Sequence, residues 1–531
     1  MRRFLISLPL IVFLLSSCTR SAPGGPPATV AALPSLANPS LPSPVPVMTY
    51  LPPTRAPGTP ISSPTADVPE ILPTFTPLPA GATQVFPTAT AGPISYTVQE
   101  GDYLGSIAVR FEISLDELLS ANNLTLDSII YPGDALLIPG TSNADQQVPI
   151  LSAPVVSSDF FKIIPDSELV YGPLSSLLDV EAFVQKQAGY LAFFTQEVDG
   201  ETLTGAQIIN KVAKNYSVNP RLLLAVLEYR SQWVTNPNPS STSETPIGYV
   251  DNFYVGFYRQ MAWTANSLSA GFYAWRENKP KEWALSDGAT VIPQPGINPG
   301  TAGVQHMFAQ LDDNTTWQID TGPNGLYATY IRMFGYPFDW AIEPLLPRGL
   351  TQPTLALPFA AGETWQFTGG PHMGWDNGSP WAALDFAAPG EPMGCAQTDA
   401  WVTAMAPGLI LRADHGAVVL DLDGDGLEQT GWTILYMHVE NRERIQPGQV
   451  VKTGQKIGHP SCEGGQADAA HIHVARRYNG VWIRADDPDA PFVLDGYTPS
   501  GDGIEYGGWL TRGDTVIEAV NGQSAINQIT P

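Results

Sequence analysis

The pattern of apolar and polar positions divides the chain into five segments. A short apolar run near the N-terminus is followed by a long stretch without a regular apolar repeat. A small region then alternates strand and helix patterns, a long region has helical patterns, and the last region has short apolar strands between Gly and Pro turns. The sequence therefore predicts a multidomain chain with a small βααβ module, a mostly α-helical middle domain and an antiparallel all-β domain at the C-terminus. The predicted boundaries are 1–17, 18–95, 96–140, 155–348 and 355–520.

Residues 1–17 have the features of a secretory signal peptide. Two arginines precede an apolar run from Phe4 to Leu15, which is shorter than the roughly 20 residues that span a bilayer. The segment that ends at Cys18 resembles the bacterial lipobox, which implies that Cys18 carries a lipid. Residues 18–95 are rich in Pro, Thr and Ser and cannot bury a core, so we expect a disordered linker. The mature protein would then lie in the cell envelope, lipid-anchored to the extracytoplasmic face of the membrane.

Residues 96–140 read as a compact βααβ unit. Tyr96–Val98 and Ala135–Ile138 are short strands, Asp102 can cap one helix, and Ser114–Glu117 forms a capping box for a second. This order and these residues resemble the lysin motif (LysM), a family that binds glycans containing N-acetylglucosamine. The resemblance implies that the glycan groove uses Gly101, Asp102, Tyr103, Leu104, Ile129, Ile130 and Tyr131.

The middle region carries helix start signals and one feature of catalytic interest. Thr204 begins a capping box, and Asn219 precedes a proline at the first position of a strongly apolar helix. Residues 215–233 resemble the first catalytic helix of lysozyme-like lytic transglycosylases. The position of that family's catalytic Glu is occupied by Arg230, and Glu228 lies about 200° away around the helix. We therefore expect a lysozyme-like domain without that acid. Transglycosylase activity through Glu228 remains an alternative.

Charge and composition narrow the classes of function. The formal net charge is −25, so the chain would repel nucleic acid, and we expect no such partner. Charged residues make up only 15% of the chain, and Gly and Pro are abundant, in keeping with many turns. Six of the seven histidines lie between His372 and His473. A scarce residue type that is concentrated in this way points to a site in the C-terminal domain.

Four histidines and one aspartate form the candidate chemical centre. His471 and His473 are two residues apart in an apolar strand, so their imidazoles point to the same side. His438 ends another predicted strand, His372 follows Gly-Gly-Pro, and Asp385 lies in Ala-Leu-Asp-Phe. Neutral imidazoles and one carboxylate are the ligands that catalytic Zn²⁺ takes, with water as the fourth. The pattern therefore predicts a zinc site.

The same motifs resemble the lysostaphin/β-lytic class of zinc metallopeptidases over roughly residues 355–518. That class cuts the peptides of peptidoglycan. The resemblance implies that His372, Asp385 and His473 hold the metal and that His471 and His438 act on the attacking water and the transition state. Zn²⁺ in this class lowers the pKa of water to about 7 and polarises the scissile carbonyl.

The choice of aspartate is open between two positions. His372 and Asp376 fit the His-x-x-x-Asp spacing of the commoner branch of this class, whereas Asp385 fits the longer spacing of the β-lytic branch. We favour Asp385 because Trp381 to Ala388 can form an ordered strand, whereas Asp376 lies in a turn.

The sequence thus predicts a lipid-anchored zinc endopeptidase that hydrolyses peptidoglycan. LysM would bind the glycan, the zinc site would bind the peptide, and the lipid would bind the membrane. In an exported domain we expect Cys395 and Cys462 to form a disulfide. The main alternative is a non-catalytic scaffold that binds the cell wall or activates a hydrolase.

Overall fold

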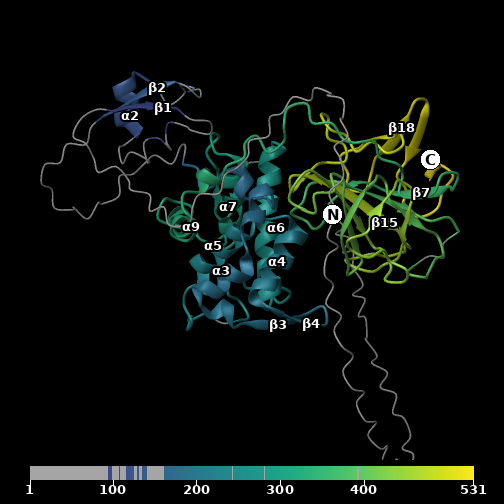
Figure 1. Cartoon of the computed structure of the whole chain (residues 1–531), viewed down its shortest axis with the longest axis horizontal. Helices are drawn as coiled ribbons and strands as arrows, with labels where there is room; N and C mark the ends of the chain where they lie inside the picture. Colours follow the sequence, from purple (N-terminus) through teal and green to yellow (C-terminus); the bar gives the residue numbers. More distant parts are fainter. Residues whose placement is uncertain are drawn as a thin grey trace, which may run out of the picture. The chain divides into compact units, whose positions relative to one another are not determined.

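The computed structural model describes the predicted βααβ module in part and nearly all of the chain from residue 161 onward (Figure 1). The described residues are 94–98, 104, 107, 115–124, 128, 130, 134–139 and 161–531, except 242, 280–281 and 391–393. The expected signal peptide, Cys18 and residues 19–93 of the expected linker lie outside these residues. The sequence predicts that the linker ends at residue 95, but a strand already begins at Ile94, so the folded module starts two residues earlier. Among the described residues, no helix combines the length and the apolar character needed to cross a membrane.

The N-terminal module pairs two strands beside a helix (Figure 1). Strand β1 (Ile94–Thr97) pairs antiparallel with β2 (Ala135–Ile138), and helix α2 spans Leu115–Asn122. The side-chain amide of Asn122 bonds the backbone of Leu137 in both directions, which fixes α2 against β2. A small apolar core fills the space between them and comprises Val98, Leu104, Ile107, Leu118, Leu119, Leu136 and Ile138.

Of the expected glycan-groove residues, Leu104 is buried in this small core and Ile130 packs against it half-buried. Gly101, Asp102, Tyr103, Ile129 and Tyr131 lie outside the described residues.

The middle region is mostly helical, as the sequence predicts. Its helices are α3 (Val180–Gln187), α4 (Gly205–Tyr216), α5 (Pro220–Ser231), α6 (Phe257–Arg276), α7 (Pro299–Ala309), α8 (Asn314–Asp320) and α9 (Leu326–Phe334). Shorter elements are the 3₁₀ turns Asp166–Glu168, Pro173–Leu177, Tyr190–Ala192 and Pro337–Trp340 and the strand pairs β3 (Thr195–Val198) with β4 (Glu201–Thr204) and β5 (Trp283–Ala284) with β6 (Thr290–Val291). The Thr204 capping box and the Asn219 cap both form at the predicted positions. Helix α5 is buried along most of its length, which places it at the centre of this domain.

Helices α6 and α7 approach each other closely because both carry a glycine at the contact. A Cβ on Gly271 would lie 2.4 Å from the Cβ of His306, and one on Gly303 would lie 2.6 Å from the carbonyl oxygen of Leu268. A larger side chain at either position would force the two helices apart. The close contact sets the position of the side chains on the facing sides of α6 and α7.

The C-terminal region is an antiparallel β-domain, as predicted. Its main sheet has the order β13-β10-β11-β12-β15-β8-β7-β20, with β16 beside β15. These strands are β7 (Trp365–His372), β8 (Ala383–Ala387), β10 (Gly408–Asp414), β11 (Ala417–Asp421), β12 (Trp432–Met437), β13 (Val450–Val451), β15 (Ile472–Tyr478), β16 (Val481–Trp482) and β20 (Gln528–Ile529). Smaller sheets contain β9 (Val402–Thr403), β14 (Lys456–Gly458), β17 (Thr498–Ser500), β18 (Trp509–Arg512) and β19 (Thr515–Glu518). The domain extends beyond the predicted boundary at 520, because β20 pairs with β7.

The two faces of the main sheet have different partners. Because side chains alternate along a strand, Leu384 and Val474 enter the core of the β-domain itself. Their neighbours Ala383 and Ala475 point to the other face and share a second core with the helices. This second core joins the helical domain to the β-domain. Asp385 has the same parity as Ala383 in β8, so it lies on the face that the helical domain covers.

A buried charge cluster strengthens the contact between the two domains. Glu428 accepts hydrogen bonds from Arg412, at 2.8 Å, and from Arg477. The two guanidinium groups also reach helix α4 and its end, where they bond the side chain of Asn215 and the carbonyl of Lys214. Burial alone would raise the pKa of Glu428, but the two arginines lower it to about 2. Glu428 is therefore a buried carboxylate that remains ionised and orients both arginines.

We expect Glu428→Gln to destabilise the protein by about 3 kcal/mol at pH 7, since the buried Arg477 and the half-buried Arg412 lose their counterion. A carboxylate with a lowered pKa in the folded state stabilises it above the unfolded pKa of about 4.5, and this contribution disappears as the pH falls through about 2. Urea unfolding at pH 7 and at low pH measures both effects. The exposed Glu518 offers a matched control, because Glu518→Gln leaves the midpoint unchanged. Equal midpoints for the two variants at pH 7 would contradict the proposed role of Glu428.

Candidate metal centre

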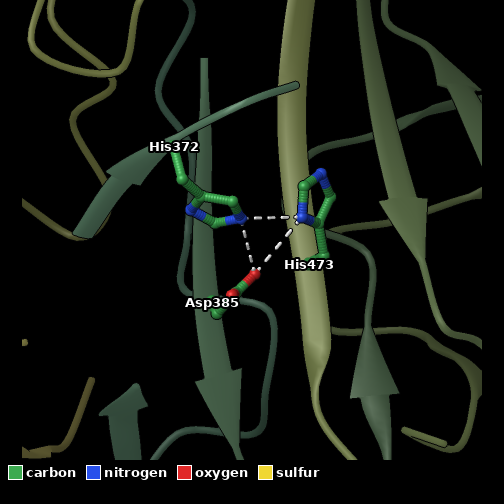
Figure 2. Close-up of side chains that lie close together, drawn as sticks. All are labelled: His372, Asp385 and His473. Carbon is green, nitrogen blue, oxygen red and sulfur yellow. Dashed lines mark hydrogen bonds and ion pairs between the residues drawn. The ribbon is translucent and has the colours of Figure 1, made fainter. Parts of the chain in front are cut away.

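Three buried side chains converge on one point of the main sheet (Figure 2). His372 Nε2 lies 2.9 Å from His473 Nδ1, and these two nitrogens lie 3.2 and 3.3 Å from Asp385 Oδ1. Tetrahedral zinc with bonds of 2.0–2.1 Å separates its ligand atoms by about 3.3 Å. The three candidate ligand atoms are therefore spaced as a metal ion requires.

Strand pairing brings the three residues together. Strands β15 and β8 are neighbours, and His473 is directly opposite Asp385 in their register. His372 ends strand β7, where the pairing with β8 shifts twice, between Phe367 and Gly369 and again between Gly369 and His372. Irregular pairing of this kind redirects side chains. Asp385 lies opposite Gly369 in the β7–β8 pairing. The irregular pairing allows the imidazole of His372 to reach the carboxylate of Asp385 all the same.

Two glycines before His372 are required by close neighbours. A Cβ on Gly369 would lie 2.7 Å from Asp385 Oδ2, so a larger residue would displace the carboxylate. A Cβ on Gly370 would lie 2.4 Å from the carbonyl oxygen of Gly507. This contact allows the backbone N–H of Gly370 to donate to the carbonyl of Tyr506. The Gly-Gly-Pro-His motif therefore serves the geometry of the site.

Backbone carbonyls determine which nitrogen of each ligand histidine is unprotonated. Nδ1 of His372 donates to the carbonyl of Gly370 at 2.8 Å, and Nε2 of His473 donates to the carbonyl of Gly374 at 3.2 Å. In the neutral rings the opposite nitrogens carry the lone pairs, and these are the two atoms that face each other at 2.9 Å. Two lone pairs and a carboxylate oxygen at such distances repel one another unless a cation or a proton lies between them.

Asp385 provides the negative charge of the centre. Burial acts to raise the pKa of its carboxyl group, but the neighbouring His372 and His471 hold that pKa well below its usual range. Burial lowers the pKa of His473, which favours its neutral form. Asp385 Oδ1 is buried and accepts no hydrogen bond from any described residue. A buried carboxylate oxygen without a partner, beside two imidazole lone pairs, fits a zinc ion.

His438 and His471 form a second pair of imidazoles beside the three candidate ligands. Their ring centroids lie 4.5 Å apart, and His471 Nε2 lies 3.8 Å from Asp385 Oδ1. Nδ1 of His438 donates to the carbonyl of Glu463, and Nδ1 of His471 donates to the carbonyl of Ala469. Burial, together with His471 and His473, lowers the pKa of His438 to about 3. All four histidines expected at the site are thus brought together.

The structure joins Cys395 and Cys462 in a disulfide whose Cα atoms are 5.6 Å apart. Cys462 lies between Ser461, which bonds the backbone of His438 and His471, and Glu463, which accepts from the His438 ring. In the chain-entropy model, a crosslink across about 67 residues contributes about 4 kcal/mol. The disulfide therefore supports the segment that orients His438 and His471.

The structure also places Tyr506 beside the three candidate ligands, a residue that the sequence did not point to. Its ring stacks on the ring of His372 with centroids 4.2 Å apart. Tyr506 has a φ of 67°, which is rare for a residue with a side chain, and its backbone bonds Gly370 and Pro371. No sequence motif marks this position, because the contact depends on a loop more than 130 residues away from His372.

The other candidate acids are engaged elsewhere. Asp376 lies in a turn, where its carboxylate accepts a hydrogen bond from Tyr216 of helix α4 at 3.3 Å, and it is not part of the converging group. Both oxygens of the buried Glu228 accept hydrogen bonds from Val234 and Thr235, just beyond the end of α5. Arg230 bonds the carbonyl of Ile247 and forms ion pairs with two aspartates of the helical domain.

Two family models match this chain. Residues 96–139 match the LysM domain, and residues 162–346 match the LasA N-terminal domain. The LysM resemblance is thereby confirmed. The second match covers nearly the whole helical region, for which the sequence had suggested a lysozyme-like fold. The chain thus combines a LysM domain, a region similar to the LasA N-terminal domain and the β-domain that holds the converging histidines.

Among curated proteins, one named "Putative hydrolase" from Streptococcus mutans serotype c is 37% identical over 71 residues, which are 13% of this chain. The matched part spans about a third (34%) of the length of that relative.

Three solved structures are also similar to parts of the chain. The M23 metalloprotease pseudoalterin is 22% identical, covers 32% of this chain and 96% of its own, and has a TM-score of 0.26. The catalytic domain of lysostaphin from Staphylococcus simulans is 24% identical, and the match covers 23% of this chain and 89% of the lysostaphin domain. Its TM-score is 0.17. A zinc-containing peptidase from Vibrio cholerae is 21% identical, and the match covers 26% of this chain and 41% of that peptidase. Its TM-score is 0.20.

The two aspartates can be separated by matched substitutions. We expect Asp385→Asn to weaken zinc binding by at least about 100-fold, because an amide oxygen lacks the charge that opposes the cation. Asp376→Asn should bind zinc as the unmodified protein does, since Asp376 contacts Tyr216 instead. Competition titration with a chelating dye gives both affinities. The reverse order of affinities would assign the ligand to Asp376.

Proposed function

We propose that this protein is a zinc endopeptidase of the cell envelope that hydrolyses peptide bonds of peptidoglycan. A lipid on Cys18 would anchor it to the extracytoplasmic face of the membrane, and the LysM domain would bind the glycan. The proposal rests chiefly on one observation. The unprotonated nitrogens of His372 and His473 and the unpartnered oxygen of Asp385 converge within 3.3 Å of one another. The matched LysM domain supports the choice of substrate.

His372, Asp385 and His473 would hold the metal. Three protein ligands are typical of catalytic zinc, which keeps a position open. Zinc in such a site lowers the pKa of water to about 7 and polarises a carbonyl group. Protonation of His372 competes with the metal for the same lone pair. Burial opposes this protonation, but the carboxylate of Asp385 outweighs burial and raises the pKa of His372.

We assign the proton transfers to the second pair of histidines. In the neutral ring of His471, Nδ1 donates to a carbonyl, so Nε2 carries the lone pair, and this atom lies 3.8 Å from the carboxylate of Asp385. It can accept the proton of the attacking water and then, as an imidazolium, donate a hydrogen bond to the oxyanion of the substrate. His438 has a pKa of about 3 and stays neutral, so its Nε2 offers a second acceptor next to His471.

The first test removes a metal ligand. We expect His473→Ala to lose both bound zinc and muropeptide release from purified peptidoglycan, because two of three ligands hold the metal poorly. Metal analysis and mass spectrometry of the released products measure the two effects. His415→Ala is a matched control, since that exposed imidazole pairs with Asp414 and lies outside the converging group. Undiminished release by His473→Ala would remove the assignment.

The second test separates catalysis from metal binding. We expect His471→Ala to keep its zinc and to lower kcat by at least about 100-fold, because a positioned general base contributes 10²–10⁴. Loss of the zinc together with activity would instead make His471 a ligand. If His471→Ala keeps both its zinc and its full activity, a group other than His471 transfers the proton.

Two other functions remain as alternatives. A non-catalytic wall-binding scaffold or hydrolase activator would bind peptidoglycan and release no peptide fragments, whatever its zinc content. Lytic transglycosylase activity would yield anhydro-sugar products from peptide-free glycan. The three hydrogen bonds that Glu228 accepts and the Arg230 ion pairs argue against that activity, because no free carboxyl group remains on α5 to protonate a leaving oxygen.

A further inference from the structure

A cavity of about 250 Å³ lies where the helical domain meets the loop that follows His372. Helices α6 and α7 and the segment before α6 form most of its wall, and Asn377 and Gly378 of the β-domain close it. Ligand pockets for drug-sized molecules have about 300–1,000 Å³, so this cavity suits a single small ring. None of its lining residues belongs to the metal centre, and the LysM domain does not contribute to it.

Aromatic rings form one wall of the cavity. The ring of Tyr249 stacks on that of Trp263 with centroids 4.0 Å apart and an angle of 13° between their planes. Tyr254 meets Tyr249 edge to face at 5.7 Å. Trp263 is buried beneath Tyr249, whereas Tyr249 and Tyr254 are both half-buried. A buried ring therefore holds a tyrosine that remains partly open to a ligand.

Polar groups form the rest of the wall. The amide side chains of Asn266, Gln310 and Asn377 line the cavity beside His306. Nδ1 of His306 donates to the carbonyl of Ser267 at 2.7 Å, so its Nε2 is left as an acceptor. Burial lowers the pKa of His306 and favours this neutral form. An aromatic wall combined with neutral amide and imidazole groups matches a ligand that has an apolar face and a rim of neutral polar groups.

The cavity is connected to the metal centre through one short loop. Gly374 accepts the hydrogen bond that orients His473, and Gly378, four residues later, donates its backbone N–H to Asn266 Oδ1 at 2.6 Å. The side chain of Ser379 bonds Trp375 and Asp376 and closes the turn between them. The loop that carries one wall of the cavity thus also orients a metal ligand.

We propose that this cavity binds one N-acetylated sugar ring of the glycan strand that carries the peptide to be cleaved. The apolar face of the sugar would stack on Tyr249 and Tyr254, and its acetamido and hydroxyl groups would bond Asn266, Gln310 and Asn377. This inference rests on the proposed peptidoglycan substrate. It gives the helical domain a role in substrate binding that is separate from that of LysM.

The test compares two substrates of the full-length zinc protein, one peptide with and without its attached disaccharide. We expect Tyr249→Ala to raise KM for the glycosylated peptide by about tenfold and to leave kcat/KM for the bare peptide within about twofold. Tyr249→Phe keeps the ring and should restore the lower KM. Phe253→Ala is a matched control, because this exposed ring contacts Tyr254 but does not line the cavity. Equal effects of Tyr249→Ala on both substrates would overturn the proposal.

A binding measurement keeps the inference distinct from the peptidase proposal. Isothermal titration of a peptide-free N-acetylglucosaminyl-N-acetylmuramyl tetrasaccharide should give two sites for the full chain and one for Tyr249→Ala, the remaining one in LysM. The number of tetrasaccharide-binding sites does not depend on peptide hydrolysis. The same stoichiometry in both proteins would contradict the inference even if the peptidase is active. Loss of one site in a protein that cleaves nothing would support it while the peptidase proposal fails.

Discussion

The arrangement of the site follows from the repulsion among three electron-pair donors held about 3 Å apart. Each ligand histidine donates its remote nitrogen to a fixed backbone carbonyl, so neither ring can turn to relieve that repulsion. The carboxylate of Asp385 is held opposite His473 by strand register, and its Oδ1 accepts no hydrogen bond from any described residue. A cation at this point would replace repulsion by attraction, and the surrounding backbone keeps the three donors in place.

The same sheet face serves two purposes. Alternate residues of β8 and β15 place Asp385 and His473 beside Ala383 and Ala475, which pack against the helical domain. The helical domain is therefore part of the surroundings of the candidate metal centre. The buried cluster around Glu428 and the shared apolar core hold the two domains together, so the sheet face that carries Asp385 and His473 lies against the helical domain.

Much of the site could be predicted because its signals are local. His471 and His473 are two apart in an apolar strand, and Asp385 lies in an apolar segment that β8 confirms. The shifted register of β7, the stacking of Tyr506 on His372 and the pairing of β20 with β7 could not be predicted, since each depends on contacts between distant segments. Cys18 and most of the LysM groove lie outside the described residues.

Arg230 replaces the acid that glycan cleavage would need, and its contacts stabilise a segment that lines the cavity. At the position where a lytic transglycosylase-like helix would carry its acid, the guanidinium bonds the carbonyl of Ile247 and pairs with Asp312 and Asp320. Tyr249 lies two residues after Ile247, so the same contact holds the segment that forms the aromatic wall of the cavity. A carboxylate could not donate to that carbonyl. The residue that argues against glycan cleavage by the helical domain therefore helps to build a surface suited to glycan binding.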